Sequence, residues 1–286
     1  MSSSNGSVVL DETGYPAGFL GPVDALSTIR VDTTDDGILA ITLARPNKLN
    51  AFDERMIREM RGVIWKANFD DSVRVIVITG EGRAFCAGRD IAGLDYENNL
   101  KTSQYRAYVR ANHELFDEIE SIEKPVIASI NGICAGGGVE MAIACDFRLA
   151  ARSASFLLPE NQLGVIPASG ACSRMIQMIG IGRLKEMIMA VEPVDAESAF
   201  RIGLVTRLCE DSDLLSDTMA FARKLLTKAP QAMGMAKHII NACQNVDTET
   251  GRMLERLGQS VLIRTEDNRE GMSAFLAKRA PRFQGR

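Results

Sequence analysis

The 286-residue sequence is poor in the residues that bind metals. It has only two histidines, His113 and His238, and no C-x-x-C pair or zinc-type cysteine–histidine spacing. We therefore expect no metal site. Most of the cysteines lie in apolar segments, which is typical of small core residues in a reducing compartment, and we expect a cytoplasmic protein. The six cysteines of the chain are Cys86, Cys134, Cys145, Cys172, Cys209 and Cys243.

Positive charge and long apolar runs are also scarce. The net charge is -4, and no basic stretch is interleaved with aromatic residues, which argues against a nucleic-acid partner. Residues 1–26 lack a basic region followed by an apolar core, so we expect a loose extension and not a signal. The most apolar run, residues 126–145, contains Ser129, Asn131, four glycines and Glu140. We expect this run to be buried core and not a membrane span.

What the sequence does contain is a pattern of strands alternating with helices. The hydrophobic content of 46% is enough for a sizeable core. Short β-branched or alternating runs predict strands, and helical periodicity lies between several of them, so the pattern predicts an α/β fold. The predicted strands span 27–31, 38–43, 74–79, 125–130 and 147–150.

Three segments have helical character. Residues 52–67 place their apolar side chains on one face and could be capped by Asn50 or Asp53. Residues 103–122 form a second amphipathic segment, and from about residue 211 to the end no strong strand signal remains. We therefore expect an all-helical region over 211–286.

Two glycine-containing loops follow predicted buried strands. They read "GRAFCAGRDI", residues 82–91, and "ICAGGGVE", residues 133–140. Glycine lets a backbone N–H approach a ligand closely, so two such loops side by side could direct two N–H groups at one oxygen, as in an oxyanion hole. The alternative is that these glycines only make tight turns. Neither loop has the spacing of a dinucleotide-binding fingerprint.

Two glutamates in apolar settings accompany these loops. Glu140 follows the glycine triplet, and Glu160 follows Pro159 in "FLLPENQLGVIP". A pair of carboxylates can hold one water, with one carboxylate as base and the other as acid if their environments differ. The alternative is a structural role for each glutamate, as a helix cap or an ion-pair partner.

The motifs together resemble the enoyl-CoA hydratase/isomerase family, the crotonase superfamily. The resemblance is carried by the two glycine loops, "LPENQLGVIP", "RPNKLNAF" and the tail "EGMSAFLAKRAPRFQGR", and it runs from about Ile29 to Arg286. It implies an α/β fold with a crotonase-like spiral of ββα units over 27–210. It also implies a helical region over 211–286 that forms a homotrimer or a dimer of trimers.

The resemblance implies a set of catalytic groups. The backbone N–H groups of Arg89 and Gly137 would hold the thioester oxygen, Glu140 would activate water, and Glu160 would protonate the α-carbon. Because both glutamates are present, hydration of the 2,3 double bond of an acyl-CoA is favoured. The alternatives are an enoyl-CoA isomerase or another CoA-enolate lyase or epimerase and, more remotely, a non-catalytic RNA-binding relative.

The resemblance also implies where the substrate binds, with CoA as part of the substrate and no other cofactor. The expected contacts are Lys48, Leu49, Ala87, Gly88, Asp90, Ile91, Gly136, Phe275 and Lys278. Two positions depart from the family pattern. Arg89 stands where many hydratases have a small residue, and Ala171 replaces the second glycine of a common P-x-x-G-G-T run. Tyr96 and Tyr105 are candidate contacts of the acyl chain.

Overall fold

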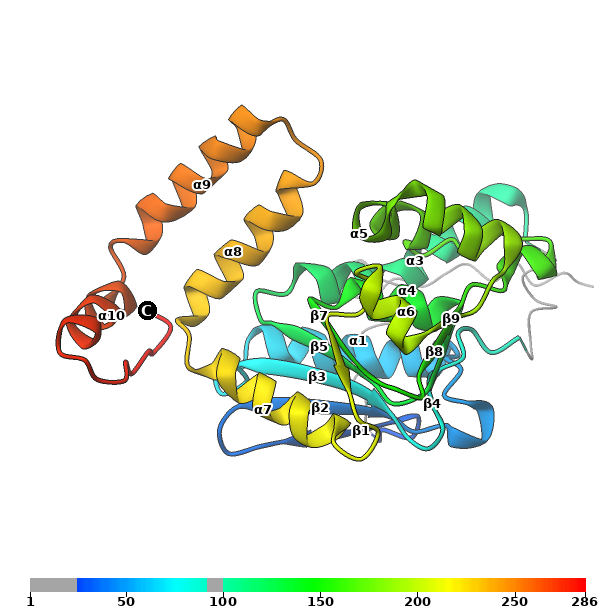
Figure 1. The fold of residues 1–286 in the computed structure, drawn as a ribbon, viewed down its shortest axis with the longest axis horizontal. Coiled ribbons are helices and arrows are strands. Elements are labelled where there is room, and N and C mark those ends of the chain that lie inside the picture. Colours follow the sequence, from blue (N-terminus) through cyan, green and yellow to red (C-terminus); the bar gives the residue numbers. More distant parts are fainter. Residues whose placement is uncertain (1–24, 92–99) are drawn as a thin grey trace, which may run out of the picture.

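A computed structural model describes residues 25–91 and 100–286, with a large sheet, a small sheet, covering helices and a projecting C-terminal arm of helices (Figure 1). The large sheet has six strands in the order β1-β2-β3-β5-β7-β10. Only the β1–β2 pair is antiparallel within this sheet; the other neighbours are parallel. The strands are β1 (Ile29–Thr33), β2 (Ile38–Leu43), β3 (Val75–Gly80), β5 (Val126–Ile130), β7 (Phe147–Ala151) and β10 (Arg207–Cys209). All five predicted strands are confirmed: β2 has the predicted ends, and the ends of the other four differ by at most two residues.

The small sheet has four strands in the order β4-β6-β8-β9, and the sequence analysis did not predict it. Its strands are two or three residues long, which is too short for an alternating pattern to stand out. They are β4 (Ala84–Cys86), β6 (Ile133–Ala135), β8 (Ser155–Leu157) and β9 (Val194–Asp195).

The chain visits the two sheets in turn, which produces the spiral. β3 leads to β4, β5 to β6 and β7 to β8, so each turn gives one strand to the large sheet and the next to the small sheet. A helix follows each pair of strands: α3 (Thr102–Ser121), α4 (Gly137–Ala144) and α5 (Ala171–Lys185). The expected spiral of ββα units is confirmed.

Both faces of the large sheet are covered, which is why its strands are apolar along their length. On one face Ile41 and Ile78 pack in the main core with Met60 of α1 (Glu54–Asn68). On the other face Val77 and Ile127 pack in a second core. Phe221 of α7 (Leu214–Leu226) belongs to that second core.

Helix α1 is capped by Asp53, one of the two residues proposed as its cap. The Asp53 carboxylate accepts a hydrogen bond from the Met56 amide at 2.9 Å, which satisfies one of the unpaired N–H groups of the first turn. The other candidate, Asn50, is fully buried and instead donates from Nδ2 to the carbonyls of Glu81 and Ala84. Asn50 therefore joins two loops and does not cap the helix.

The C-terminal region is helical from α7 onward, as expected. Helices α8 (Pro230–Cys243), α9 (Thr248–Leu262) and α10 (Glu266–Leu276) extend away from the sheets (Figure 1). Helix α7, which follows residue 211, packs on the large sheet and shares a core with it. The boundary expected at residue 211, between the spiral core and the helical region, stays a prediction. Most of the extension expected over 1–26 lies outside the described residues.

Short elements complete the structure. They are the 3₁₀ turns η1 (Pro46–Lys48) and η2 (Glu160–Leu163), the π-helical turn η3 (Glu186–Ala190) and helix α6 (Ala196–Arg201). Among the described helices, none is long and apolar enough to cross a lipid bilayer.

Candidate active site

The functional loops expected from the sequence meet at one edge of the small sheet. Ala87–Arg89 follows β4, Gly136–Gly137 follows β6, and Pro159–Glu160 comes soon after β8. These three strands are parallel neighbours, so their carboxyl ends lie together. The Gly136 amide donates to the Leu157 carbonyl at 2.8 Å, which joins the second loop to the third.

The first two loops approach as closely as their backbones permit. Gly88 has a φ of +91°, and a Cβ placed on it would lie 3.0 Å from the Gly137 nitrogen and 2.9 Å from the Ala135 oxygen. Gly137 is the first residue of α4, where an N–H group has no acceptor within the helix. The amide of Arg89 comes directly after Gly88 in the adjoining backbone. The structure thus brings the two expected oxyanion donors onto touching loops.

The aromatic ring of Phe52 packs beneath Gly137. A Cβ on Gly137 would lie 2.5 Å from Cζ of Phe52, so any side chain at position 137 would collide with the ring. The Phe52 backbone also pairs with the first loop: its amide donates to the Gly88 carbonyl at 2.8 Å, and its carbonyl accepts from the Asp90 amide at 2.9 Å. The sequence predicts a helix from residue 52, but α1 begins at Glu54, so Phe52 lies just before the helix, and its contact with Gly137 was not predicted.

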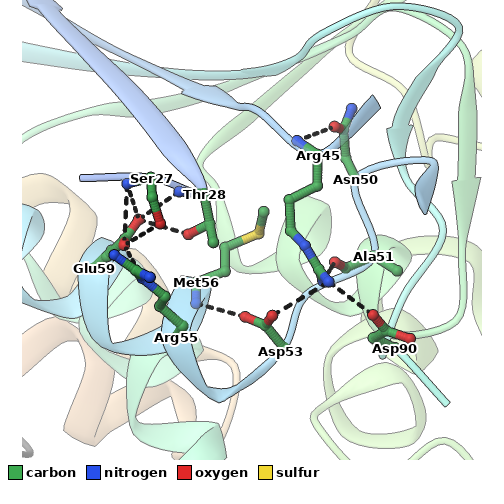
Figure 2. A network of polar contacts seen from close by, with 10 residues as sticks. All are labelled: Ser27, Thr28, Arg45, Asn50, Ala51, Asp53, Arg55, Met56, Glu59 and Asp90. Atoms are coloured by element: carbon green, nitrogen blue, oxygen red, sulfur yellow. Dashed lines mark hydrogen bonds and ion pairs between the residues drawn. The ribbon is translucent and has the colours of Figure 1, made fainter. Parts of the chain in front are cut away.

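Arg45 connects the segment before α1 to the loop after β4 through its guanidinium group. Its guanidinium binds the Asp90 carboxylate at 2.8 Å, the Asp53 carboxylate at 3.3 Å and the Ala51 carbonyl at 2.5 Å (Figure 2). These charge-assisted contacts fix the loop that carries Gly88 and Arg89. Asp90, expected at the substrate site, therefore has a structural partner in Arg45.

Glu140 is buried in the first turns of α4 with 3% of its surface exposed. Its carboxylate accepts hydrogen bonds from the amides of Ser169 at 2.6 Å and Ala171 at 3.2 Å. Burial nevertheless raises the pKa of Glu140, and these bonds offset only part of the effect. Desolvation is the largest of the causes that act on the pKa of Glu140, and it outweighs the hydrogen bonds from the two amides.

Glu160 opens η2 beside the glycine triplet. A Cβ on Gly136, whose φ is +49°, would lie 2.9 Å from Oε1 of Glu160. Oε2 of Glu160 is buried and has no hydrogen-bond partner within the described part of the chain. Burial, to which the charge of Glu140 adds, raises the pKa of Glu160 to about 7. The two carboxyl groups therefore differ in environment, as an acid–base pair requires.

The side chain of Arg89 turns toward helix α3. Its guanidinium carbon lies 5.1 Å from the ring centre of Tyr108, and it hydrogen-bonds the tyrosine hydroxyl. That hydroxyl donates to Glu54 of α1 at 3.0 Å. The unusual arginine thus packs against α3 through its side chain, while its amide stays in the loop after β4.

The expected CoA contacts fall into two groups. Leu49 accepts a hydrogen bond from the Ala87 amide at 2.9 Å, so exposed Lys48 lies beside the site loops, and Ile91 at the end of the described loop is 65% exposed. Phe275, 80% exposed, and Lys278 lie on or just after α10, at the opposite end of the molecule (Figure 1). Phe275 and Lys278 are therefore far from the glycine loops of their own chain. Tyr96 lies outside the described residues.

The family can be tested by comparison with known proteins. A model of the enoyl-CoA hydratase/isomerase family matches residues 33–286. The chain belongs to this family. Within the enoyl-CoA hydratase/isomerase family, relatives of different activity are about equally similar to the chain.

Crotonyl-CoA hydratase of Syntrophomonas wolfei subsp. wolfei is 34% identical over 250 residues, 87% of this chain and 95% of that protein. The 1,2-epoxyphenylacetyl-CoA isomerase of Escherichia coli is 33% identical over 257 residues, 88% of this chain and 97% of that protein. The solved structure of an enoyl-CoA hydratase from Bacillus anthracis superposes with a TM-score of 0.86 at 34% identity, covering 91% of this chain and all of that one. These matches confirm the crotonase fold.

The backbone amides that bind Glu140 were not predicted from the sequence. The amides that hold Glu140 belong to "PASGACS", residues 167–173, whose Gly170 has a φ of +120°. A glycine directly before a helical run is a local signal of an unusual turn, although it does not reveal which carboxylate the turn binds.

Proposed function

We propose that this protein is an enoyl-CoA hydratase, which adds water across the 2,3 double bond of an acyl-CoA thioester. The observation that carries the proposal is the pair of glutamates in unequal environments beside two adjoining backbone donors. Glu140 is held by two amides, whereas Glu160 has a pKa raised to about 7. Hydration needs a base and an acid near one carbonyl oxygen, and this arrangement supplies both.

The thioester oxygen would be held by the N–H groups of Arg89 and Gly137. When hydroxide adds to the β-carbon, the electrons of the double bond move toward the carbonyl, and negative charge develops on that oxygen. Fixed donors that point at developing charge lower the barrier, and losing one typically costs roughly 3–4 kcal/mol. The N-terminus of α4, which begins at Gly137, adds a favourable dipole.

The two carboxyl groups would divide the proton transfers. Glu140, whose hydrogen bonds from Ser169 and Ala171 favour its ionised form, would take a proton from the water as its oxygen bonds to the β-carbon. Glu160, whose raised pKa favours its protonated form, would give a proton to the α-carbon. One water is added with no net oxidation or reduction, so the reaction requires no cofactor beyond the CoA of the substrate. After the addition Glu140 carries the proton taken from water and Glu160 has given one up, so Glu140 releases a proton to solvent and Glu160 takes one up before the next turnover.

CoA itself would lie along the loops beside β4, with Lys48 near its phosphates. Phe275 and Lys278 would reach a CoA site only through another copy of the chain, because α10 lies far from the loops of its own chain (Figure 1). Exposed apolar side chains on this arm support such an assembly. Met253, Leu257 and Val261 of α9 are 46%, 57% and 58% exposed and are spaced along one helix face.

We infer a homotrimer or a dimer of trimers that works in the cytoplasm. The apolar face of α9 supports the first inference, and the six free cysteines support a reducing compartment. Native mass spectrometry of the full chain would test the assembly, since a monomer at micromolar concentration would contradict it.

The reaction is tested by incubating the protein with a short trans-2-enoyl-CoA in ¹⁸O-labelled water. We expect a 3-hydroxyacyl-CoA that carries one ¹⁸O atom. A 3-enoyl-CoA of the same chain length distinguishes hydration from double-bond isomerisation. If the protein converts the 3-enoyl compound to the 2-enoyl compound and does not hydrate the latter, it is an isomerase and the proposal is wrong.

A further inference from the structure

An open pocket of about 820 Å³ lies next to the two glutamates. Among the described residues, its walls are α3, η2 and the segment that follows η2. Asn161, directly after Glu160, and Ala168, directly before the Ser169 amide that binds Glu140, both belong to its lining. The volume is within the range of small-molecule sites. Through these two neighbouring residues the pocket adjoins the glutamates and offers space for an acyl chain.

The α3 wall of the pocket is basic. Arg106, Val109, Arg110 and His113 all line it, and their spacing places them on one face of the helix. Within residues 25–91 and 100–286, neither Arg106 nor Arg110 makes an ion pair or a side-chain hydrogen bond. Both arginines are exposed at the pocket.

The acidic side chains that α3 also carries are engaged elsewhere. Arg174 binds Asp117 and Glu120, both at 2.7 Å, and Arg61 binds Glu114 at 2.7 Å. These carboxylates do not pair with Arg106 or Arg110, although the charge of Asp117 acts on His113.

His113 adds a polar atom to this wall. Its Nε2 is buried and has no hydrogen-bond partner within the described part of the chain, which is costly for a polar atom. Burial lowers the pKa of His113, so the ring is neutral at pH 7 and Nε2 can donate or accept one hydrogen bond.

The opposite wall is apolar. Val165 and Ile166 line the pocket with 54% and 67% of their surfaces exposed. Side chains of this kind on the surface favour contact with hydrocarbon. The pocket thus joins an apolar wall, which fits methylene groups, to a cationic wall, which fits an anion.

We propose that the substrate is a 2-enoyl-CoA whose acyl chain ends in a carboxylate, and that Arg106 and Arg110 recognise this carboxylate. The proposal rests on the hydratase function proposed above. The arginine fork matches carboxylate geometry, and charge-assisted hydrogen bonds are about twice as strong as neutral ones. A methyl-ended chain would leave the two cations without a ligand.

The test compares two substrates of equal carbon number, trans-2-hexenoyl-CoA and the 2-enoyl-CoA of a six-carbon dicarboxylic acid. We expect kcat/KM to be about tenfold higher or more for the carboxylated substrate. The double variant Arg106→Gln/Arg110→Gln should lose this preference and retain its activity toward the methyl-ended substrate. Arg58→Gln, which removes an exposed cation of α1 outside the pocket, should retain the preference.

Binding separates a failure of this proposal from a failure of the hydratase assignment. Titration calorimetry with the saturated analogues, adipoyl-CoA and hexanoyl-CoA, needs no turnover. Tighter binding of adipoyl-CoA that disappears in the double variant supports the proposal even if neither enoyl-CoA is hydrated. Equal binding of both analogues, or a preference that survives in the double variant, overturns it, and hydration of hexenoyl-CoA would still stand.

Discussion

The charge of Glu140 helps to raise the pKa of Glu160, which burial and this neighbouring carboxylate together bring to about 7. A carboxyl group with a pKa of about 7 is partly protonated at neutral pH, which is what a general acid at this position requires. Glu140 is the member with two backbone donors, so its ionised form is better supported. This relationship leads to a prediction about the pH dependence of the reaction.

Hydration should slow as the pH rises through about 7, because protonated Glu160 is the acid that supplies the α-carbon. The kcat for a 2-enoyl-CoA, measured from pH 5.5 to 9, should fall with an apparent pKa near 7. Glu160→Gln should lower kcat by roughly 10²- to 10⁴-fold, which is typical of a general acid, with little change in CoA-ester binding. A wild-type profile flat up to pH 9 would exclude the acid role of Glu160.

The same carboxyl group should make stability depend on pH. Its folded-state pKa is raised above the unfolded value, so folding favours the protonated form and the protein loses stability as pH rises from about 4.5 through 7. Glu160→Gln removes this loss. The variant should therefore raise the thermal midpoint at pH 8 and leave it nearly unchanged at pH 4.5. Equal shifts at both values would show that burial does not perturb Glu160.

Glu140→Gln should slow hydration strongly while the fold survives, because a Gln oxygen can still accept from the Ser169 and Ala171 amides. We expect a loss of roughly 10²- to 10⁴-fold in kcat. The pKa of Glu160 should move down, because one of the causes that raise it is gone. Glu210→Gln, in an exposed ion pair with Arg152, is the matched control. Unchanged hydration in Glu140→Gln would favour isomerase chemistry, which needs fewer carboxylates.

Gly137→Ala should reduce activity by displacing a backbone donor, since the new methyl group would lie 2.5 Å from the ring of Phe52. Losing the donor predicts a drop of roughly 10²- to 10³-fold in kcat per folded molecule. Gly182→Ala, where nothing lies within 4 Å of the added carbon, is the control.

Phe52→Leu provides a rescue for this variant. If the collision with the ring is the cause, Gly137→Ala/Phe52→Leu should recover part of kcat, because alanine keeps its own N–H group. Gly136→Ala is not a suitable control, since a Cβ at Gly136 would lie 2.9 Å from Oε1 of Glu160. A folded Gly137→Ala enzyme with normal turnover would remove Gly137 from the proposed oxyanion hole.

Removing the candidate phosphate contacts should raise KM with little change in kcat, because such contacts bind substrate and transition state equally. This is expected for Lys48→Ala and Lys278→Ala, and the exposed Lys185 of α5 offers a control on another surface. Mixed assemblies of Lys48→Ala and Lys278→Ala chains would test whether one CoA site uses two copies of the protein. The assignment is wrong if KM stays unchanged in both single variants.

The sequence by itself determined the features that depend on neighbouring residues. The apolar runs of β2, β3 and β5 and the amphipathic face of α1 are local properties, and each predicted element is present. The glycines of the two loops were also readable, because a backbone that must pass close to another backbone tolerates no side chain. Glu140 and Glu160 stood out because a carboxylate in an apolar run is unusual.

Only the tertiary structure decided which residues that are distant in the sequence lie close together. The strands of the small sheet are two or three residues long and form only because the parts of the chain before and after them place them side by side. The pKa of Glu160 depends on burial and on Glu140, which is distant in sequence. The separation of Phe275 from the site loops, and the basic pocket wall formed by Arg106 and Arg110, follow from how whole helices pack. Burial and proximity are properties of the folded chain, and no local pattern encodes them.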